Sequence, residues 1–385
     1  TGQFQLTDDQ LAIQDMARRF TADRITPFAA QWDEDHHFPR DVVQAAGELG
    51  FGAIYVSEES GGIALGRLEA ALIMEAMAYG CPATSAYISI HNMASWMIDR
   101  FGGREVKAKF LPRLVSMEHI ASYALTEPGS GSDAAALKTT AKLDGDTYVV
   151  NGTKQFISGS GFNDIYVVMV RTGDDKEPKN KSGGITCLVV EKGTPGLSHG
   201  APEKKLGWNA SPTAQLIFED CRVPACNRVG AEGEGFRFAM AGLDGGRLNI
   251  GACSLGGAQR CLDEAVAYTK ERQQFGQPIA DFQNTQFMLA DMATELEAAR
   301  ALLYLAAAKV TANAPDKTRF SAMAKRLATD AGSNVVNDAL QLFGGYGYLK
   351  DYPIERFWRD LRVHSILEGT NQVMRMIVGR DMLRQ

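Results

Sequence analysis

Residues 362–372 read RVHSILEGTNQ, and the organisation of the chain can be followed outward from this stretch. An apolar pair runs into Glu368, a glycine follows, and Thr370 or Asn371 can cap the helix that the apolar spacing of residues 373–378 predicts. The stretch therefore reads as a short connection between two helices. A carboxylate between apolar residues and flexible backbone is poorly solvated, which makes Glu368 a candidate general base. On this stretch alone a solvated surface glutamate is the better interpretation, because most glutamates are exposed.

The sequence on either side divides into three regions and predicts a mainly α protein with a central β domain. Residues 1–120 have helical spacing, beginning with a capping box at Thr7. Residues 121–230 contain β-branched runs, a hairpin signature at Asp144-Gly145-Asp146 and a short strand at 215–218. Residues 231–385 return to long amphipathic runs at about 236–272, 281–312 and 318–342, which are typical of a helical bundle. The apolar segment 87–101 is expected to be buried on most sides, as core or as the wall of a ligand pocket.

Composition excludes several classes of partner. The 385 residues exceed the length at which one hydrophobic core keeps growing, so two or three domains are expected. A content of 45% hydrophobic and 22% charged residues is that of a soluble globular protein. The net charge of −6 disfavours nucleic acid and anionic membranes, and no apolar run is long enough to cross a bilayer. We therefore expect neither nucleic acid nor membrane as a partner.

The cysteines indicate a reducing compartment. Six cysteines are scattered along the chain, and no histidine or cysteine cluster accompanies them. Buried, reduced thiols are therefore the preferred interpretation, and no metal site is expected. The first residues, TGQF, have neither the basic nor the apolar region of a secretory signal. We expect a cytoplasmic protein if the source is bacterial, or a mitochondrial matrix protein if the chain is a processed eukaryotic one.

Four further motifs could bind a ligand, although each has a simpler explanation. Within the segment YALTEPGSGSD (123–133) a strand is expected to end at Thr126, and the Gly/Ser-rich loop that follows can hold an anionic ligand or form a tight turn. The segment KQFISGSG (154–161) offers the Phe156 ring and the Ser158 hydroxyl to a flat ring system. Arg272, at a break between two bundle helices, can bind phosphate or cap a helix. The paired glycines of QLFGGYGY (341–348) end a helix and allow close approach to the backbone.

Together with the Glu368 stretch, these motifs resemble the acyl-CoA dehydrogenase family over nearly the whole chain, in order and at the family's spacing. The segments YALTEPGSGSD, ERQQFGQP (271–278), GGYGY (344–348) and ILEGTNQV (366–373) are jointly very specific. The resemblance implies an N-terminal helical domain, a middle β-barrel or β-sandwich domain and a C-terminal four-helix bundle. It also implies a homotetramer with FAD between the β domain and the bundle.

The resemblance assigns roles to individual residues. It places the following residues against FAD: Tyr123, Leu125, Thr126, Gly131, Ser132, Phe156, Ile157, Ser158, Thr370, Asn371 and Gln372. A second set would bind FAD from a neighbouring subunit: Arg272, Gln274, Phe275, Phe282, Gln283, Gln341, Gly344 and Gly345. A third set would contact the CoA thioester: Ser132, Asp244, Gly245, Gly246, Arg247, Gly369 and Arg380.

The resemblance makes Glu368 the catalytic base. Some members of the family carry the base at the position of Gly246, and a glycine there leaves Glu368 for this role. Glu368 would remove the α-proton of a saturated thioester while flavin N5 takes the β-hydride, because no side chain can accept a hydride. The thioester carbonyl would be polarised by the Glu368 backbone N–H and a ribityl hydroxyl of the flavin. Asn209 stands where many members have arginine, and the resemblance gives it no role.

The expected substrate is a short branched acyl-CoA, namely isobutyryl-CoA, which would yield methacrylyl-CoA in valine breakdown. Ile90, Met93 and Leu367 would form the wall of a short, wide pocket. Butyryl-CoA and 2-methylbutyryl-CoA stay open, because a pocket discriminates one methylene by only about 1–3 kcal/mol. Electron transfer flavoprotein is the expected acceptor. An oxidase that passes electrons to oxygen and a non-enzymatic helical scaffold are the competing functions.

Overall fold

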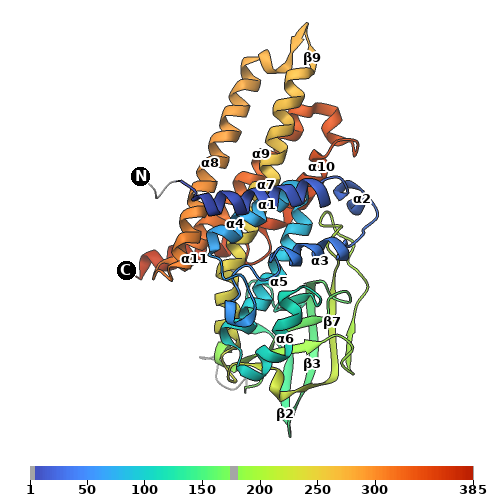
Figure 1. Cartoon of the computed structure of the whole chain (residues 1–385), viewed down its shortest axis with the longest axis vertical. Helices are drawn as coiled ribbons and strands as arrows, with labels where there is room; N and C mark the ends of the chain where they lie inside the picture. Colours follow the sequence, from blue (N-terminus) through green and yellow to red (C-terminus); the bar gives the residue numbers. More distant parts are fainter. Residues whose placement is uncertain (1–4, 174–180, 385) are drawn as a thin grey trace.

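The computed structural model describes residues 5–173 and 181–384, which form three regions along the long axis of the molecule (Figure 1). A β-sheet lies at one end, long C-terminal helices extend to the other, and the N-terminal helices cross between them. The predicted mainly α fold with a central β domain is confirmed. The N-terminal helices are α1 (Asp8–Arg24), α2 (Ala29–Glu34), α3 (Arg40–Glu48), α4 (Arg67–Gly80), α5 (Pro82–Phe101) and α6 (Arg104–Val115).

The start of α1 and the burial of α5 agree with the predictions from the sequence. The predicted capping box is present, because the Thr7 hydroxyl accepts from the Gln10 N–H at 3.2 Å and the Gln10 side chain accepts from the Thr7 N–H at 3.0 Å. Helix α5 starts with Pro82, whose missing N–H costs nothing at a first turn. Most of its side chains are buried, which confirms the prediction for segment 87–101. It packs against α4, α7 and β1 and so links all three regions.

The middle region is a single eight-stranded sheet. Its strands follow the order β6-β7-β3-β2-β4-β5-β8, and β1 pairs with β4 in parallel. The predicted hairpin is confirmed, because Asp144 pairs with Thr147 around Gly145, whose φ is +65°. The strands are β1 (Ala121–Ala124), β2 (Thr140–Asp144), β3 (Thr147–Ser158), β4 (Ile165–Arg171), β5 (Ile185–Glu191), β6 (Leu197–His199), β7 (Thr213–Pro224) and β8 (Arg228–Val229).

Two strand predictions were wrong in extent. Strand β1 ends at Ala124 rather than Thr126, because Glu127 and Ser130 exchange backbone hydrogen bonds of 3.0 Å and turn the chain out of the sheet. Strand β7 runs from residue 213 to 224 rather than from 215 to 218, because the long strand β3 pairs with it along its length.

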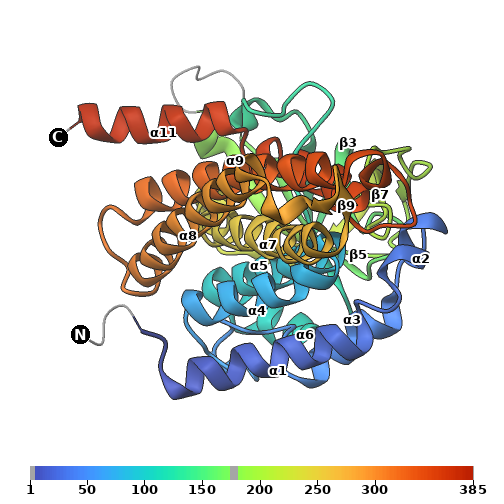
Figure 2. The same ribbon diagram turned by 90° about the horizontal axis from the view of Figure 1, so that it is seen from above.

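The C-terminal region is built on three long helices with a fourth beside them (Figure 2). The chain forms α7 (Gly235–Glu271), α8 (Gln283–Thr311), α9 (Lys317–Phe343), α10 (Ile354–Leu361) and α11 (Asn371–Leu383). Helix α9 packs against α7, α8 and α11, which confirms the predicted bundle. A hairpin of β9 (Gln273–Gln274) and β10 (Gln277–Pro278) joins α7 to α8 at the far end of the molecule. The 3₁₀ turns are η2 (Glu58–Ser60), η3 (Ala134–Ala136), η4 (Lys181–Gly184), η5 (Ala225–Asn227), η6 (Ile279–Asp281), η7 (Gly344–Tyr348) and η8 (Arg362–Ser365).

Asn209 lies where the three regions meet. Its side chain donates to Asp33 of α2 at 3.1 Å, and Asp33 forms an ion pair of 2.7 Å with Arg359 of α10. One residue earlier, the Trp208 N–H donates to the Asp360 carboxylate at 2.6 Å. The loop before β7 is therefore fixed to the helix that precedes the Glu368 stretch. Asn209, to which the family resemblance gives no role, therefore has a structural one, because it joins this loop to α2.

Candidate active site

Glu368 lies in the tight connection between η8 and α11. Its φ is +53° and that of Gly369 is +90°, so two successive residues adopt the left-handed conformation. Thr370, rather than Asn371, caps α11, because its hydroxyl accepts from the Val373 N–H at 3.2 Å. The turn directs the Glu368 side chain back toward the middle of α7.

The Glu368 carboxylate fills space that a glycine leaves free. A Cβ atom added to Gly246 would lie 2.5 Å from Glu368 Oε2 and 2.9 Å from the sulfur of Met93. Glu368, α7 and α5 therefore converge on one small volume. Gly246 is needed for this convergence, because any side chain there would occupy the position of the carboxylate.

Burial and two cations set the ionisation of Glu368. Its Oε2 atom is buried and has no hydrogen-bond partner among the residues that the structure describes. Burial raises the pKa of Glu368 to about 7, while the positive charges of Arg247 and Lys325 act in the opposite direction. A carboxyl group with a pKa near the working pH can both accept a proton and release it, which suits a general base.

Tyr123 presents a second unpaired polar atom to this site. Its hydroxyl is buried without a hydrogen-bond partner in the described part of the chain. Burial raises the pKa of Tyr123, and the negative charge of Glu368 adds to the rise. Buried polar groups are normally hydrogen-bonded. The unpaired oxygens of Tyr123 and Glu368 therefore indicate a volume built for the polar atoms of a ligand.

The motif around Phe156 presents an aromatic ring near the C-terminal end of β3. An irregularity in the pairing of β3 with β7 between Lys154 and Ile157 places Phe156 at φ +57° with 64% of its surface exposed. The Ser158 carbonyl accepts from the Ser122 hydroxyl at 2.6 Å. A strained residue that presents an aromatic ring to solvent is typical of a binding surface.

The adjacent Gly/Ser-rich loop is held rigidly at its base. The Glu127 carboxylate accepts from the backbone N–H groups of Lys138 and Thr139, and the buried Lys154 lies 3.6 Å from it. The Lys154 ammonium also donates to the carbonyl of Leu125 at 3.0 Å. Beyond this base, no atom of the described residues lies within 4 Å of a Cβ atom added to Gly131. The loop is thus open toward a ligand.

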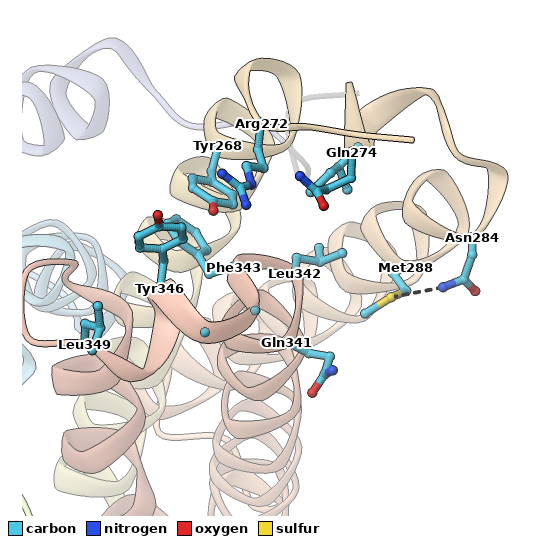
Figure 3. Close-up of a pocket in the computed structure, with 13 residues that line it drawn as sticks. Tyr268, Arg272, Gln274, Asn284, Met288, Gln341, Leu342, Phe343, Tyr346 and Leu349 are labelled. Atoms are coloured by element: carbon cyan, nitrogen blue, oxygen red, sulfur yellow. Dashed lines mark hydrogen bonds between the residues drawn. The ribbon is translucent and has the colours of Figure 1, made fainter. Parts of the chain in front are cut away.

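A second site lies at the far end of the bundle. A pocket of about 660 Å³ opens there between the end of α7 and η7, and Figure 3 shows Arg272 and Gln274 facing Phe343 and Tyr346 across it. Five of the residues predicted to bind FAD of a neighbouring subunit line this pocket, namely Arg272, Gln274, Gln341, Gly344 and Gly345. Phe275 and Phe282 contact each other edge to face beside it, and Phe275 is 95% exposed. Gln283 follows as the first residue of α8.

The two sites are far apart within one chain. Gly246 and Arg272 belong to α7 and its C-cap and are separated by 26 residues, which corresponds to about 39 Å of helix. The structure therefore brings the residues predicted to bind FAD into two separate groups rather than one.

The residues predicted to contact CoA are also divided. On α7 the Arg247 guanidinium lies 3.5 Å from the Asp244 carboxylate. The same carboxylate accepts from the Thr318 hydroxyl at 2.8 Å. Gly245 and Gly246 lie between them, and Arg247 donates to the carbonyl of Glu368, the residue before Gly369. Ser132 and Arg380 are exposed at the surface of the β domain and on α11, respectively.

The sequence reasoning missed Lys325 and the side chains around Arg67. Lys325 of α9 is fully buried, and its ammonium donates to the carbonyl of Gly369 at 2.8 Å. The available signal was a lysine among the small apolar residues of α9. The guanidinium of Arg67 is buried and stacks on the rings of Tyr55 and Trp96 at 3.6 and 4.8 Å. No sequence pattern pointed to that stack.

Two observations concern membranes and metals. Within residues 5–173 and 181–384, no helix has the length and apolar character that crossing a bilayer requires. In the same part of the chain, no three His, Cys, Asp or Glu side chains are grouped so that they could hold a metal ion.

Comparison with known proteins now identifies the class. Three family models match in succession: the acyl-CoA dehydrogenase N-terminal domain over residues 7–118, the middle domain over 122–221 and the C-terminal domain over 233–383. The chain belongs to the acyl-CoA dehydrogenase family. It is a flavoprotein oxidoreductase that acts on CH–CH bonds of acyl-CoA, with FAD as its cofactor.

Individual relatives are similar over nearly their whole length. The chain is 57% identical to the mitochondrial isobutyryl-CoA dehydrogenase of Dictyostelium discoideum, with 98% of this chain and 90% of the relative covered. It is 51% identical to the corresponding enzyme of Bos taurus, over 99% and 90% of the two chains. Among solved structures, butyryl-CoA dehydrogenase from Megasphaera elsdenii is 38% identical with a TM-score of 0.95, covering 99% of this chain and 100% of the other.

Proposed function

We propose that this acyl-CoA dehydrogenase oxidises isobutyryl-CoA to methacrylyl-CoA in valine breakdown, with Glu368 as the base. The buried, unpaired carboxylate of Glu368 against Gly246 is the observation that carries the assignment of the base. The similarity to two isobutyryl-CoA dehydrogenases supports the choice of substrate. The bulk of Met93, which contacts the same volume, and of the partly buried Leu367 agrees with a short acyl pocket.

The chain supplies the proton-transfer part of the reaction. Glu368 Oε2 takes the α-proton of the bound thioester, and the resulting carboxylic acid tolerates burial better than the carboxylate does. Among the described residues, the Glu368 N–H donates to no carbonyl, so it is free to polarise the thioester oxygen. Bound FAD supplies the acceptor for the β-hydride. Helices α5 and α7 pack against each other beside the carboxylate, and this packing would limit the access of water while the proton is held on Glu368.

The residues present fit an FAD group beside the C-terminal ends of β1 and β3. Phe156 offers an exposed ring surface, Gly131 leaves the adjacent loop open, and Tyr123 has an unpaired hydroxyl. We propose that these residues hold the flavin together with Leu125, Thr126, Ser132, Ile157, Ser158, Thr370, Asn371 and Gln372.

We further propose that the pocket lined by Arg272 and Gln341 holds the adenosine diphosphate half of FAD from a second subunit. The pocket lies about 39 Å along α7 from Gly246, farther than one extended dinucleotide reaches. The guanidinium of Arg272 suits a diphosphate. A homotetramer, the assembly that the sequence suggests, would bring such a pocket to a neighbouring flavin.

The remaining assignments rest on the family resemblance. Electron transfer flavoprotein is the proposed acceptor, and residues near 120 and 230 are the proposed domain boundaries. The Ser132, Asp244, Arg247 and Arg380 side chains would contact CoA. The compartment would be the cytoplasm in a bacterium or the mitochondrial matrix in a eukaryote.

Flavin bleaching without oxygen tests the substrate. The holoenzyme is mixed with isobutyryl-CoA and, separately, with butyryl-CoA and 2-methylbutyryl-CoA, and the flavin absorbance is followed. Fastest bleaching by isobutyryl-CoA is expected. Faster bleaching by butyryl-CoA would assign the enzyme to short-chain fatty acids, and peroxide formed rapidly on reoxidation would indicate an oxidase.

The variant Glu368→Gln tests the base. It keeps the size of the side chain but cannot accept the proton, so turnover should fall by at least about 10²–10⁴-fold. FAD content should be unchanged. The variant Glu59→Gln, at an exposed position, serves as the control. Turnover of Glu368→Gln at the rate of the unaltered enzyme would refute the assignment.

A further inference from the structure

Two buried cations from different helices hold the turn that carries Glu368. The Arg247 guanidinium of α7 donates to the carbonyl of Glu368 at 3.0 Å. The Lys325 ammonium of α9 donates to the next carbonyl, that of Gly369, at 2.8 Å. Both residues of the turn have positive φ, a conformation that is costly for a glutamate and persists only where surrounding contacts impose it.

Lys325 is placed unusually for a lysine. Its side chain is fully buried in the bundle, where an ammonium group is expensive to desolvate. Its second acceptor is the Asn371 side chain at 2.9 Å, and Asn371 in turn donates to Thr329 at 2.9 Å and Asp330 at 2.7 Å. In the described part of the chain, no carboxylate lies within the 4.0 Å of an ion pair with Lys325. The charge is therefore not used in a salt bridge.

The two donors act next to the atoms that the reaction needs. The carbonyl of Glu368 and the N–H of Gly369 belong to one peptide plane, and the carbonyl of Gly369 belongs to the next. Fixing both planes anchors the turn on the C-terminal side of the Glu368 Cα atom, from which the side chain and the N–H group of Glu368 extend. A simple helix cap would explain the bond to Asn371, but it would not explain an ammonium group facing the turn.

We infer that Lys325 is a positioning residue for the dehydrogenation: its charge and its bond to Gly369 hold the turn in the conformation that presents the Glu368 carboxylate and N–H to the thioester. This inference rests on the proposed role of Glu368 as the base. Arg247 fixes the first carbonyl of the turn, and Lys325 fixes the second.

Lys325 also influences the ionisation of the base. Removing its positive charge would raise the pKa of Glu368 further above its ordinary value, because burial would then be opposed by Arg247 alone. Burial lowers the pKa of Lys325 itself to about 8. Several ionisable groups face this pair from the packed elements: Tyr55, Tyr123, Arg247, Cys253, Asp330 and His364. The carboxylate of Glu368 and the ammonium of Lys325 therefore coexist best at about pH 7–8.

Two variants separate the charge from the hydrogen bond. Lys325→Met removes both, and we expect kcat to fall by about 10²-fold with a smaller change in KM, because misplacing a reacting group by about 1 Å has that effect. The acid limb of the kcat/KM profile should move up by about one pH unit. Lys325→Gln keeps a donor without the charge, so it should recover part of kcat but keep the displaced acid limb. The control is Lys205→Met, which removes a partly buried lysine bonded to the Ser211 carbonyl and the Thr213 hydroxyl.

FAD absorbance and the Tm are measured for each variant, so that loss of cofactor or of folding is distinguished from loss of positioning. If Lys325→Met binds FAD and keeps the kcat and acid limb of the unaltered enzyme, the inference is wrong. If Lys325→Met does not fold, the pH profile of the unaltered holoenzyme tests the inference instead. Its kcat/KM should fall again above about pH 8 as Lys325 loses its proton, and a profile flat to about pH 10 would overturn the inference. Loss of turnover in Glu368→Gln together with a normal Lys325→Met would reject only the role of Lys325.

Discussion

Replacing Gly246 by alanine tests whether space beside α7 is what places the base. The added methyl group would lie 2.5 Å from Glu368 Oε2, whereas ordinary contact begins at 3.4 Å, so the carboxylate must move by about 0.9 Å. The sulfur of Met93, at 2.9 Å, blocks another direction of escape. A displacement of about 1 Å at a reacting group reduces rate by about 10²-fold. We expect kcat/KM to fall by that factor.

The effect on stability should be small. Alanine favours a helix over glycine by about 1 kcal/mol, which offsets part of the steric strain. The matched control is Gly379→Ala on α11, where an added Cβ has no neighbour within 4 Å among the residues that the structure describes. It should raise the Tm slightly and leave turnover unchanged. The assay is anaerobic flavin bleaching at matched FAD content. A Gly246→Ala enzyme that folds, binds FAD and reacts within about twofold of the unaltered rate would refute the reasoning.

Two further predictions concern other parts of the molecule. Arg272→Met removes the cation that stacks on Tyr346 at 5.4 Å and faces the far pocket. The dissociation constant of FAD, measured by the fluorescence of released flavin, should rise at least about tenfold. An unchanged dissociation constant would argue against binding of phosphate by Arg272. Asp33→Asn breaks the ion pair with Arg359 and should lower the free energy of unfolding by about 1–2 kcal/mol. The Tm should fall while turnover per bound FAD stays unchanged. An unchanged Tm would mean that the contacts of Asp33 with Arg359 and Asn209 do not stabilise the fold.

The features that the sequence predicted well are local ones. The capping box at Thr7, the hairpin at Gly145 and the helix–turn–helix around Glu368 each depend on residues within a few positions of one another. Their partners are therefore visible in the same short window of sequence. The motif resemblance extended this to the family, because several such windows occur in a fixed order.

The length of a strand was harder to predict, because it depends on pairing with another strand that is distant in the sequence. Strand β7 continues past residue 218 through Glu219, Asp220 and Arg222, which are polar and hide the strand from a pattern of apolar residues. The pairing with β3 carries the strand through them. The sequence also suggested that β1 extends to Thr126, although the turn of Glu127 ends it sooner.

Glu368 shows the same difference between what nearby residues reveal and what distant residues determine. The sequence around Glu368 fits a solvated glutamate at a helix cap as well as it fits a buried general base. The difference lies in Gly246, which is 122 positions earlier and supplies the empty space, and in Lys325, which supplies charge from a third helix. Neither contributes a pattern near residue 368. In the proposed role of Glu368 as the base, Gly246 leaves room for the carboxyl group at a buried position, burial raises its pKa to about 7, and the charge of Lys325 limits that rise.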